Sequence, residues 1–274
     1  MLILTKEDIE AVCSMEDAIE AVKEAFIIHS EGSVKVPLRI NIRSDKYNGN
    51  MLFMPAYCEQ KDAASLKIVS VYPDNKEKKL PTTPAQVLLI DPSTGIVLSI
   101  LDGTYITALR TGAASGAAFS VLAKSECKMG ALIGTGTQAA MQLEAMITSK
   151  KPKIVKVYSR NKERLNIFVE NMKTKFKSKD VEITASDSAD AAVEEADILI
   201  TATNSDKPLF SARSCKPGLT ISAVGSFTKQ MQELDAMVLK KASKIYYDDK
   251  EAMLEEAGEI IKALENNDID EKKL

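Results

Sequence analysis

Hydrophobic and polar positions divide the chain into two halves with different periods. In the first half, apolar residues at helical spacing predict a short helix that begins after Thr5 and a longer one over residues 15–29. From residue 34 the period changes to two, which predicts strands, and Asn48-Gly49 is a typical hairpin turn. Short turns join the strands expected at residues 34–54, 63–71, 85–91 and 96–101, so this half predicts an α+β fold with a mostly antiparallel or mixed sheet.

In the second half, short apolar runs alternate with helical patterns, as a doubly wound parallel sheet requires. Strands are expected at residues 129–133, 154–158, 181–185, 198–202, 220–224 and 240–247. Helices are expected at residues 138–148, 162–175 and 188–195, and the charged tail at 250–274 is expected to form one further helix. A helix rich in small residues, at 104–124, links the halves. The sequence therefore predicts an α/β protein, with an α+β domain of residues 1–112 and a doubly wound Rossmann domain of residues 113–274.

One loop of the second half carries a dinucleotide-binding fingerprint. Gly134, Gly136 and Ala139 have the spacing G-x-G-x-x-A, between an apolar strand and a helix. Gly134 permits the tight turn, Gly136 lets the backbone approach the phosphates, and Ala139 lets the helix pack on the strand. The N–H groups of the loop, including those of Thr137 and Gln138, then face the anion at the positive end of the helix. The alternative is an ordinary strand–helix turn, because glycine-rich turns are common.

The tip of the second Rossmann strand indicates which dinucleotide is bound. A NAD site places an acidic residue there for the ribose 2′-OH, but this tip reads Ser159, Arg160 and Asn161, with Arg164 one helical turn further. A guanidinium and hydroxyl groups suit a 2′-phosphate, which a carboxylate would repel. The pattern favours NADP(H) as the cofactor, with NAD(H) possible if Arg160 is only a solvated residue at a strand end.

Small residues follow two later strands. Thr203 comes after the strand expected at 198–202, and Val224 and Ser226 lie at the end of the strand expected at 220–224. Ligands of open α/β sheets bind at the carboxyl ends of the strands, so these residues are expected near the ribose and the nicotinamide. The alternative, that each is a simple loop residue, remains open.

Three cations of the first domain have unusual surroundings in the sequence. Arg39 lies in the alternating segment VPLRINI, Lys67 in the apolar segment SLKIVSV, and Arg110 on the helix rich in small residues. A charge on an apolar strand is costly unless it is paired or functional, although Arg39 could also face water. A partly buried lysine shifts its pKa readily and can donate a proton. Together the three cations predict a site for a small carboxylate substrate beside a nicotinamide ring.

Composition excludes several classes of function. The net charge of −3 gives no nucleic-acid footprint, and no apolar run reaches the length of a membrane span. The four cysteines are scattered and His29 is the only histidine, so no metal site is predicted. Scattered thiols and the lack of a signal-peptide pattern predict a cytoplasmic protein.

Short motifs in a fixed order through nearly the whole chain carry a resemblance to a known family. They are Met54-Pro55, Lys67, Tyr72-Pro73-Asp74-Asn75, Leu101-Asp102-Gly103, residues 110–114, the loop 134–138, Ala196-Asp197-Ile198, Thr201-Ala202-Thr203, Val224-Gly225-Ser226 and Glu233-Leu234-Asp235. In this combination the chain resembles the ornithine cyclodeaminase/mu-crystallin family, which includes ketimine reductases and one type of alanine dehydrogenase.

The resemblance implies a homodimer built through the first domain. It also implies that Arg39, Lys67 and Arg110 meet the substrate carboxylate, and that Thr82 and Thr111 lie near the nicotinamide end of the cofactor. The expected function is that of an NAD(P)H-dependent reductase of a small imino acid, or the reverse reaction of an amino-acid dehydrogenase.

Two departures from the family pattern leave alternatives. Cyclodeaminases and the related alanine dehydrogenases carry an aspartate just after the Val-Gly pair, which members of the reductase and crystallin type lack. Phe227 holds that place here, after Ser226. Phenylalanine cannot move a proton, so ornithine cyclisation is the weaker alternative. Members of the family usually continue for several dozen residues beyond residues 257–260, and this chain stops at Leu274, as a natural short form or a truncated one. A dinucleotide-dependent binding protein of the crystallin type, with little turnover, is the other alternative.

Overall fold

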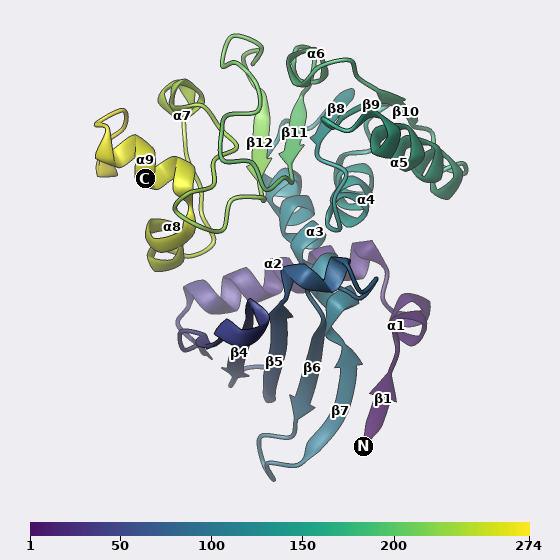
Figure 1. Ribbon diagram of the computed structural model, residues 1–274, viewed down its shortest axis with the longest axis vertical. Helices are drawn as coiled ribbons and strands as arrows, with labels where there is room; N and C mark the ends of the chain where they lie inside the picture. The colour runs from purple at the N-terminus through teal and green to yellow at the C-terminus, as the bar shows by residue number, and fades with distance from the viewer. The chain divides into compact units, whose positions relative to one another are not determined.

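The computed structural model describes all 274 residues, and the chain divides into two compact units. Unit 1 comprises Met1–Thr111 and unit 2 comprises Gly112–Leu274. Each unit is built on its own β-sheet (Figure 1). Helix α3 (Gly103–Leu122) contains the boundary between the two units. None of the helices combines the length and the apolar character that a membrane crossing requires.

The sheet of unit 1 is mixed, as the sequence predicts. Its seven strands have the order β1-β7-β6-β5-β4-β2, and β3 also pairs with β4. Only the β1–β7 pair is parallel. The three-residue strand β1 was not expected, because so short a run has no recognisable period. The strands are β1 (Leu2–Leu4), β2 (Val34–Lys35), β3 (Ile40–Ser44), β4 (Gly49–Cys58), β5 (Ala63–Val71), β6 (Ala85–Ile90) and β7 (Val97–Asp102).

Two capped helices precede the antiparallel strands of unit 1. Helix α1 (Lys6–Val12) begins after Thr5, as expected, with a capping box in which the hydroxyl of Thr5 accepts from the backbone N–H of Asp8. Helix α2 (Met15–Ser30) begins with a second capping box at Ser14. The expected hairpin turn is confirmed at Asn48, which has a φ of 46° between β3 and β4. Short 3-10 helices cover Asp45–Tyr47 and Pro73–Lys76.

Unit 2 contains the predicted Rossmann sheet. Its five strands have the order β10-β9-β8-β11-β12, and every pair is parallel. The strands are β8 (Met129–Ile133), β9 (Ile154–Tyr158), β10 (Glu182–Ala185), β11 (Ile198–Thr201) and β12 (Thr220–Ala223). The helices that alternate with them are α4 (Ala139–Lys150), α5 (Lys162–Lys175) and α6 (Ala189–Val193).

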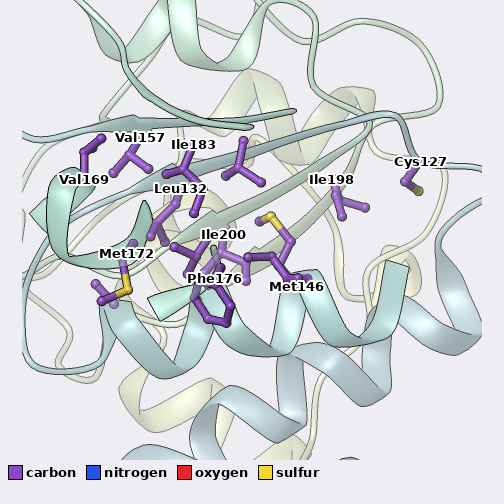
Figure 2. Close-up of a cluster of buried hydrophobic side chains, with 14 of the residues drawn as sticks. Cys127, Leu132, Met146, Val157, Val169, Met172, Phe176, Ile183, Ile198 and Ile200 are labelled. Atoms are coloured by element: carbon purple, nitrogen blue, oxygen red, sulfur yellow. The ribbon is translucent and has the colours of Figure 1, made fainter. Parts of the chain in front are cut away.

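The central strands of unit 2, β8 and β11, are buried on both faces, which explains their continuous apolar runs. On β8, Leu132 belongs to one apolar cluster, whereas Ala131 and Ile133 belong to a second. Figure 2 shows the first cluster, in which Leu132 lies among side chains of β9, β10, β11 and helix α5. Two apolar layers therefore hold the central strands in place and fix where each strand ends.

The last part of unit 2 differs from the expectation. Residues 240–247 do not form a strand. Helix α7 (Ala236–Lys241) occupies the start of this segment, because the carboxylate of Asp235 accepts from the N–H of Met237 and caps the helix. The buried side chains of α7 are Val238 and Leu239.

The single tail helix expected at 250–274 is also wrong. The tail forms α8 (Lys250–Glu256), α9 (Gly258–Glu265) and a 3-10 turn at Glu271–Lys273. The break falls at Ala257, and α9 begins at Gly258, where a Cβ atom would overlap the backbone carbonyl oxygens of Thr228 and Met231. Tertiary contact, rather than a local breaker pattern, therefore divides the tail.

Candidate functional site

The strand order of unit 2 reverses between β8 and β11. After β8, the chain builds β9 and β10 on one side and then returns to place β11 and β12 on the other side (Figure 1). In open α/β sheets a ligand binds at the carboxyl ends of the strands at such a switch point. The loops that follow β8 and β11 are therefore the first candidates for a ligand site.

The loop after β8 has the geometry that its glycines predict. Gly134 has a φ of 114°, and a Cβ there would overlap the carbonyl oxygen of Ala202 at the end of β11. Its N–H donates to the carbonyl oxygen of Tyr158 at 2.9 Å. A Cβ at Gly136 would meet nothing within 4 Å, so open space faces that position. Ala139, which begins α4, is fully buried. The loop is therefore held tightly at Gly134 and open at Gly136.

Two buried polar atoms beside these strand ends lack a partner within the protein. The Oε1 atom of Gln138, at the N-terminus of α4, accepts no hydrogen bond, and neither does the Oγ atom of Ser226, in the loop after β12. Thr137, which lies between Gly136 and Gln138, is exposed in the turn. Buried unsatisfied polar atoms are rare in native proteins and are explained by a water or a ligand. Together with the glycine loop, these two atoms fit a bound dinucleotide.

The tip of β9 presents cations and no carboxylate. Ser159 and Arg160 follow the strand, and the side chain of Arg160 is exposed. Asn161 is the N-cap of α5, and its Oδ1 atom accepts from the N–H of Arg164 at 2.9 Å. Asn161 therefore has a structural role in starting the helix, while Arg160 and the exposed Arg164 remain available to a phosphate.

A buried carboxylate lies at the ends of β11 and β12, in the motif Glu233-Leu234-Asp235, to which the sequence analysis assigned no role in the site. Glu233 has no exposed surface and accepts hydrogen bonds from Thr201, Thr203 and Gly225. Burial raises the pKa of this carboxyl above its ordinary value, although the hydrogen bonds oppose the rise. The carboxylate of Glu233 thus holds Thr203 in place. Val224 continues the pairing of β12 with β11, because its N–H donates to the carbonyl oxygen of Thr201 at 2.9 Å.

In unit 1, two of the predicted cations, Arg110 and Arg39, act electrostatically on the third, Lys67. Lys67 lies on β5, between Met54 of β4 and Val87 of β6. The pKa of Lys67 is lowered to about 8, mainly by burial and then by the positive charges of Arg110 and Arg39. Arg39 lies just before β3 and Arg110 lies on α3. The sheet and the helix therefore bring three cations from distant parts of the sequence into one electrostatic cluster, which suits a small carboxylate.

The two threonines implied by the resemblance lie on other segments of unit 1. Thr82 precedes β6, and its carbonyl oxygen accepts from the N–H of Tyr72 at 2.8 Å. Thr111 lies on α3, and its hydroxyl donates to the carbonyl oxygen of Thr107 at 2.6 Å. In unit 2, the position after Ser226 carries the phenyl ring of Phe227 and no carboxylate. This ring is 60% exposed.

Comparisons with known proteins agree over nearly the whole chain. The alanine dehydrogenase of Archaeoglobus fulgidus is 38% identical over 259 residues, which are 94% of this chain and 77% of that protein. The structure of Thermococcus litoralis Delta(1)-pyrroline-2-carboxylate reductase in complex with NADH and L-proline has a TM-score of 0.92 at 39% identity and covers 100% of this chain and 84% of that one. The structure of an archaeal alanine dehydrogenase dimer with bound NAD has a TM-score of 0.89 at 36% identity. The match covers 100% of this chain and 82% of that one.

The sequence profile of the ornithine cyclodeaminase/mu-crystallin family matches residues 1–272 of this chain. This match covers both units and includes every motif on which the resemblance was based. The resemblance is therefore confirmed, and the chain belongs to the ornithine cyclodeaminase/mu-crystallin family.

Proposed function

We propose that the protein is an NAD(P)H-dependent oxidoreductase that reduces the C=N bond of a small imino acid, or catalyses the reverse oxidation of an amino acid. The observation that carries this proposal is the cluster of Lys67, Arg110 and Arg39, in which the pKa of a partly buried lysine is lowered to about 8. The cluster belongs to a chain whose other unit has a glycine loop suited to a dinucleotide. A relative that is 39% identical is in complex with NADH and L-proline, which is a cyclic amino acid.

In this proposal the residues of the cluster have distinct roles. Arg39 and Arg110 bind the substrate carboxylate through their planar guanidinium groups and orient the carbon that bears the nitrogen. A bound reduced nicotinamide would supply the hydride to that carbon. Lys67 contacts the carboxylate and donates the proton that the nitrogen gains, because a pKa of about 8 keeps its ammonium protonated near pH 7 but able to release a proton.

The dinucleotide site is assigned to the loops of unit 2. The N–H groups of residues 134–138 receive the pyrophosphate, and Thr203, Val224 and Ser226 line the nicotinamide–ribose end. Thr82 and Thr111 of unit 1 are proposed to act near the nicotinamide. The exposed Arg160 and the absence of a carboxylate at the tip of β9 support a preference for NADPH, with NADH also accepted.

A homodimer through unit 1 forms part of the same proposal. Large apolar side chains are exposed along and before β3, at Val36, Leu38, Ile40 and Ile42, with exposures from 48% to 74%. Several exposed large apolar side chains within one short segment favour an interaction surface there. The archaeal alanine dehydrogenase is described as a dimer, and a second copy of this chain is the partner that we propose. The four cysteines are free thiols, which suits the proposed cytoplasmic location.

The test is a panel of substrates with the full-length protein. Delta(1)-pyrroline-2-carboxylate, its six-membered homologue and pyruvate with ammonium are each offered with NADH and with NADPH, and oxidation is followed by absorbance. We expect saturable oxidation with at least one imino acid, and a loss of about 10²–10⁴-fold in kcat/KM for Lys67→Ala. Tight binding of NADPH without turnover of any substrate would instead support a binding protein. Release of proline from ornithine would support a cyclodeaminase, which Phe227 argues against.

The choice of dinucleotide is tested separately. Arg160→Ala is expected to weaken the binding of NADPH by about tenfold, because one charge-assisted hydrogen bond is lost, while NADH binding changes little. Equal affinities for both dinucleotides that do not change in Arg160→Ala would contradict the proposed preference.

A further inference from the structure

Glu233 makes four hydrogen bonds to the two strand ends that border the proposed nicotinamide site. Its Oε1 atom accepts from the backbone N–H and the hydroxyl of Thr203, each at 2.7 Å. Its Oε2 atom accepts from the hydroxyl of Thr201 and from the backbone N–H of Gly225, each at 2.8 Å. The side chain has no exposed surface, so these four donors solvate the carboxylate in place of water. One carboxylate therefore joins the end of β11 to the end of β12.

The backbone of Glu233 is itself held firmly. Its carbonyl oxygen accepts from the N–H of Leu209 at 2.9 Å, and the preceding N–H of Gln232 donates to the carbonyl oxygen of Ser205 at 2.8 Å. At Gly225 a Cβ atom would overlap both the carbonyl oxygen of Thr203 and the carboxylate of Glu233. The segments that carry Thr203, Gly225 and Glu233 are therefore in direct contact.

This contact continues to the glycine loop. A Cβ built at Gly134 would lie 3.1 Å from the Cγ2 atom of Thr203, so Thr203 lies directly against the glycine loop. On the other side, Gly225 is followed by Ser226, whose buried Oγ atom has no partner within the protein. The carboxylate of Glu233 thus holds Thr203, which contacts the glycine loop, and Gly225, which precedes the unpartnered hydroxyl of Ser226.

We propose that Glu233 is the positioning residue of the dinucleotide site, which fixes Thr203 and Ser226 for the nicotinamide–ribose end of the cofactor. This inference rests on the proposed function only in requiring that unit 2 binds a reduced dinucleotide. Glutamine cannot replace the carboxylate. If its NH2 group takes the Oε1 position it faces the N–H of Thr203, and in the Oε2 position it faces the N–H of Gly225. Either orientation releases one of the two loops.

Asp197 provides a matched control at the opposite end of the same sheet. Its carboxylate is also buried, and it accepts from the backbone N–H groups of Lys128 at 2.7 Å and Met129 at 3.0 Å, where β8 begins. Lys124 and Lys216 form ion pairs with it. Asp197→Asn therefore disturbs a buried carboxylate at the amino ends of the strands, away from the proposed cofactor site.

The experiment compares full-length Glu233→Gln and Asp197→Asn with the unchanged protein. Dissociation constants for NADH and NADPH are measured by nicotinamide fluorescence, at a temperature at which circular dichroism shows each protein to be folded. Hydrogen exchange of the segments around Thr203 and Gly225 is measured by mass spectrometry. We expect Glu233→Gln to raise the dissociation constant about tenfold and to speed exchange in at least one of the two segments. Asp197→Asn should lower the melting temperature and change the dissociation constant by less than about twofold.

Unchanged dinucleotide binding in a folded Glu233→Gln protein would overturn the inference, and so would an equal loss of binding in Asp197→Asn. If Glu233→Gln does not fold, Thr201→Val and Thr201→Ser replace it. The valine removes one donor to the carboxylate and is expected to raise the dissociation constant about threefold, and the serine, which keeps the donor, should restore it. Unchanged binding in Thr201→Val would overturn the inference.

Binding and turnover separate this inference from the proposed function. An unchanged protein that binds NADH but reduces no imino acid contradicts the proposed function, while the binding comparison still decides the role of Glu233. An unchanged protein that binds neither dinucleotide overturns both.

Discussion

Lys67 is expected to set the pH dependence of imine reduction. Its pKa is lowered to about 8 because burial disfavours the ammonium and because Arg110 and Arg39 add like charge. A group with that pKa is about nine-tenths protonated at pH 7 and about one-tenth protonated at pH 9. The pH dependence of kcat/KM reports the essential acid of the free protein. We therefore expect kcat/KM for the imino acid to fall about tenfold per pH unit once the pH exceeds about 8.

The assay follows the oxidation of saturating NADH or NADPH at several concentrations of the imino acid, between about pH 6 and pH 10 at constant ionic strength. Lys67→Arg is the matched control, because a guanidinium keeps its charge throughout this range. It should be slower than the unchanged protein and should lack the fall near pH 8.

Arg39→Gln supplies an independent check on the cause of the low pKa. Removing this positive neighbour raises the pKa of Lys67, so the fall in kcat/KM should move to higher pH. The move should be smaller than the whole displacement from 10.5 to about 8, because burial is the largest cause. A fall near pH 8 that persists in Lys67→Arg would refute the reasoning, because another group or the substrate would then be titrating.

Three further predictions concern stability. Lys67→Met should raise the free energy of unfolding by about 1–2 kcal/mol at pH 7, after a discount for the partial exposure of Lys67. In the unchanged protein, the free energy of unfolding should rise with pH between about 8 and 10.5, because the unfolded chain binds more protons in that range. Urea titrations measure both effects. Gly134→Ala should cost about 1–3 kcal/mol and weaken NADH binding, because alanine strains a φ of 114°. Asp197→Asn should cost about 2–4 kcal/mol at pH 7. Burial opposes ionisation of Asp197, but its ion pairs with Lys124 and Lys216 hold the pKa well below the usual range. Stability should therefore fall with pH below about 4 more steeply in the unchanged protein than in the variant, which keeps only the contributions of other carboxyls such as Asp8, Asp17 and Asp91.

The sequence could predict the parts of the site that local patterns determine. The glycine loop needs a positive φ at Gly134 and open space at Gly136, and both requirements depend on residues that are adjacent in the sequence. The alternating strands of unit 1 made Lys67 conspicuous, because a lysine among apolar strand residues has few structural explanations. Its interaction with Arg110 and Arg39 depends on how the sheet and α3 fold, and the sequence could only suggest it.

Features that depend on tertiary contact could not be predicted in the same way. Glu233 lies in a polar segment, and its donors are eight to 32 residues away in the sequence, so no local pattern marks it as buried. The break between α8 and α9 depends on the contact of Gly258 with the carbonyl oxygens of residues 228–231. The apolar and aromatic residues at 240–247 imitate a strand, whereas the cap at Asp235 begins a helix just before them.

The most direct test of the whole account is the transfer of deuterium in a single turnover. NADH that carries deuterium at both hydrogen positions of nicotinamide C4 is mixed with excess protein and Delta(1)-pyrroline-2-carboxylate, and the proline formed is analysed by mass spectrometry. The account predicts one deuterium per proline, on the carbon that bears the nitrogen and the carboxylate, and a loss of this product in Lys67→Ala. Proline that carries no deuterium, or labelled proline formed equally fast by Lys67→Ala, would contradict it.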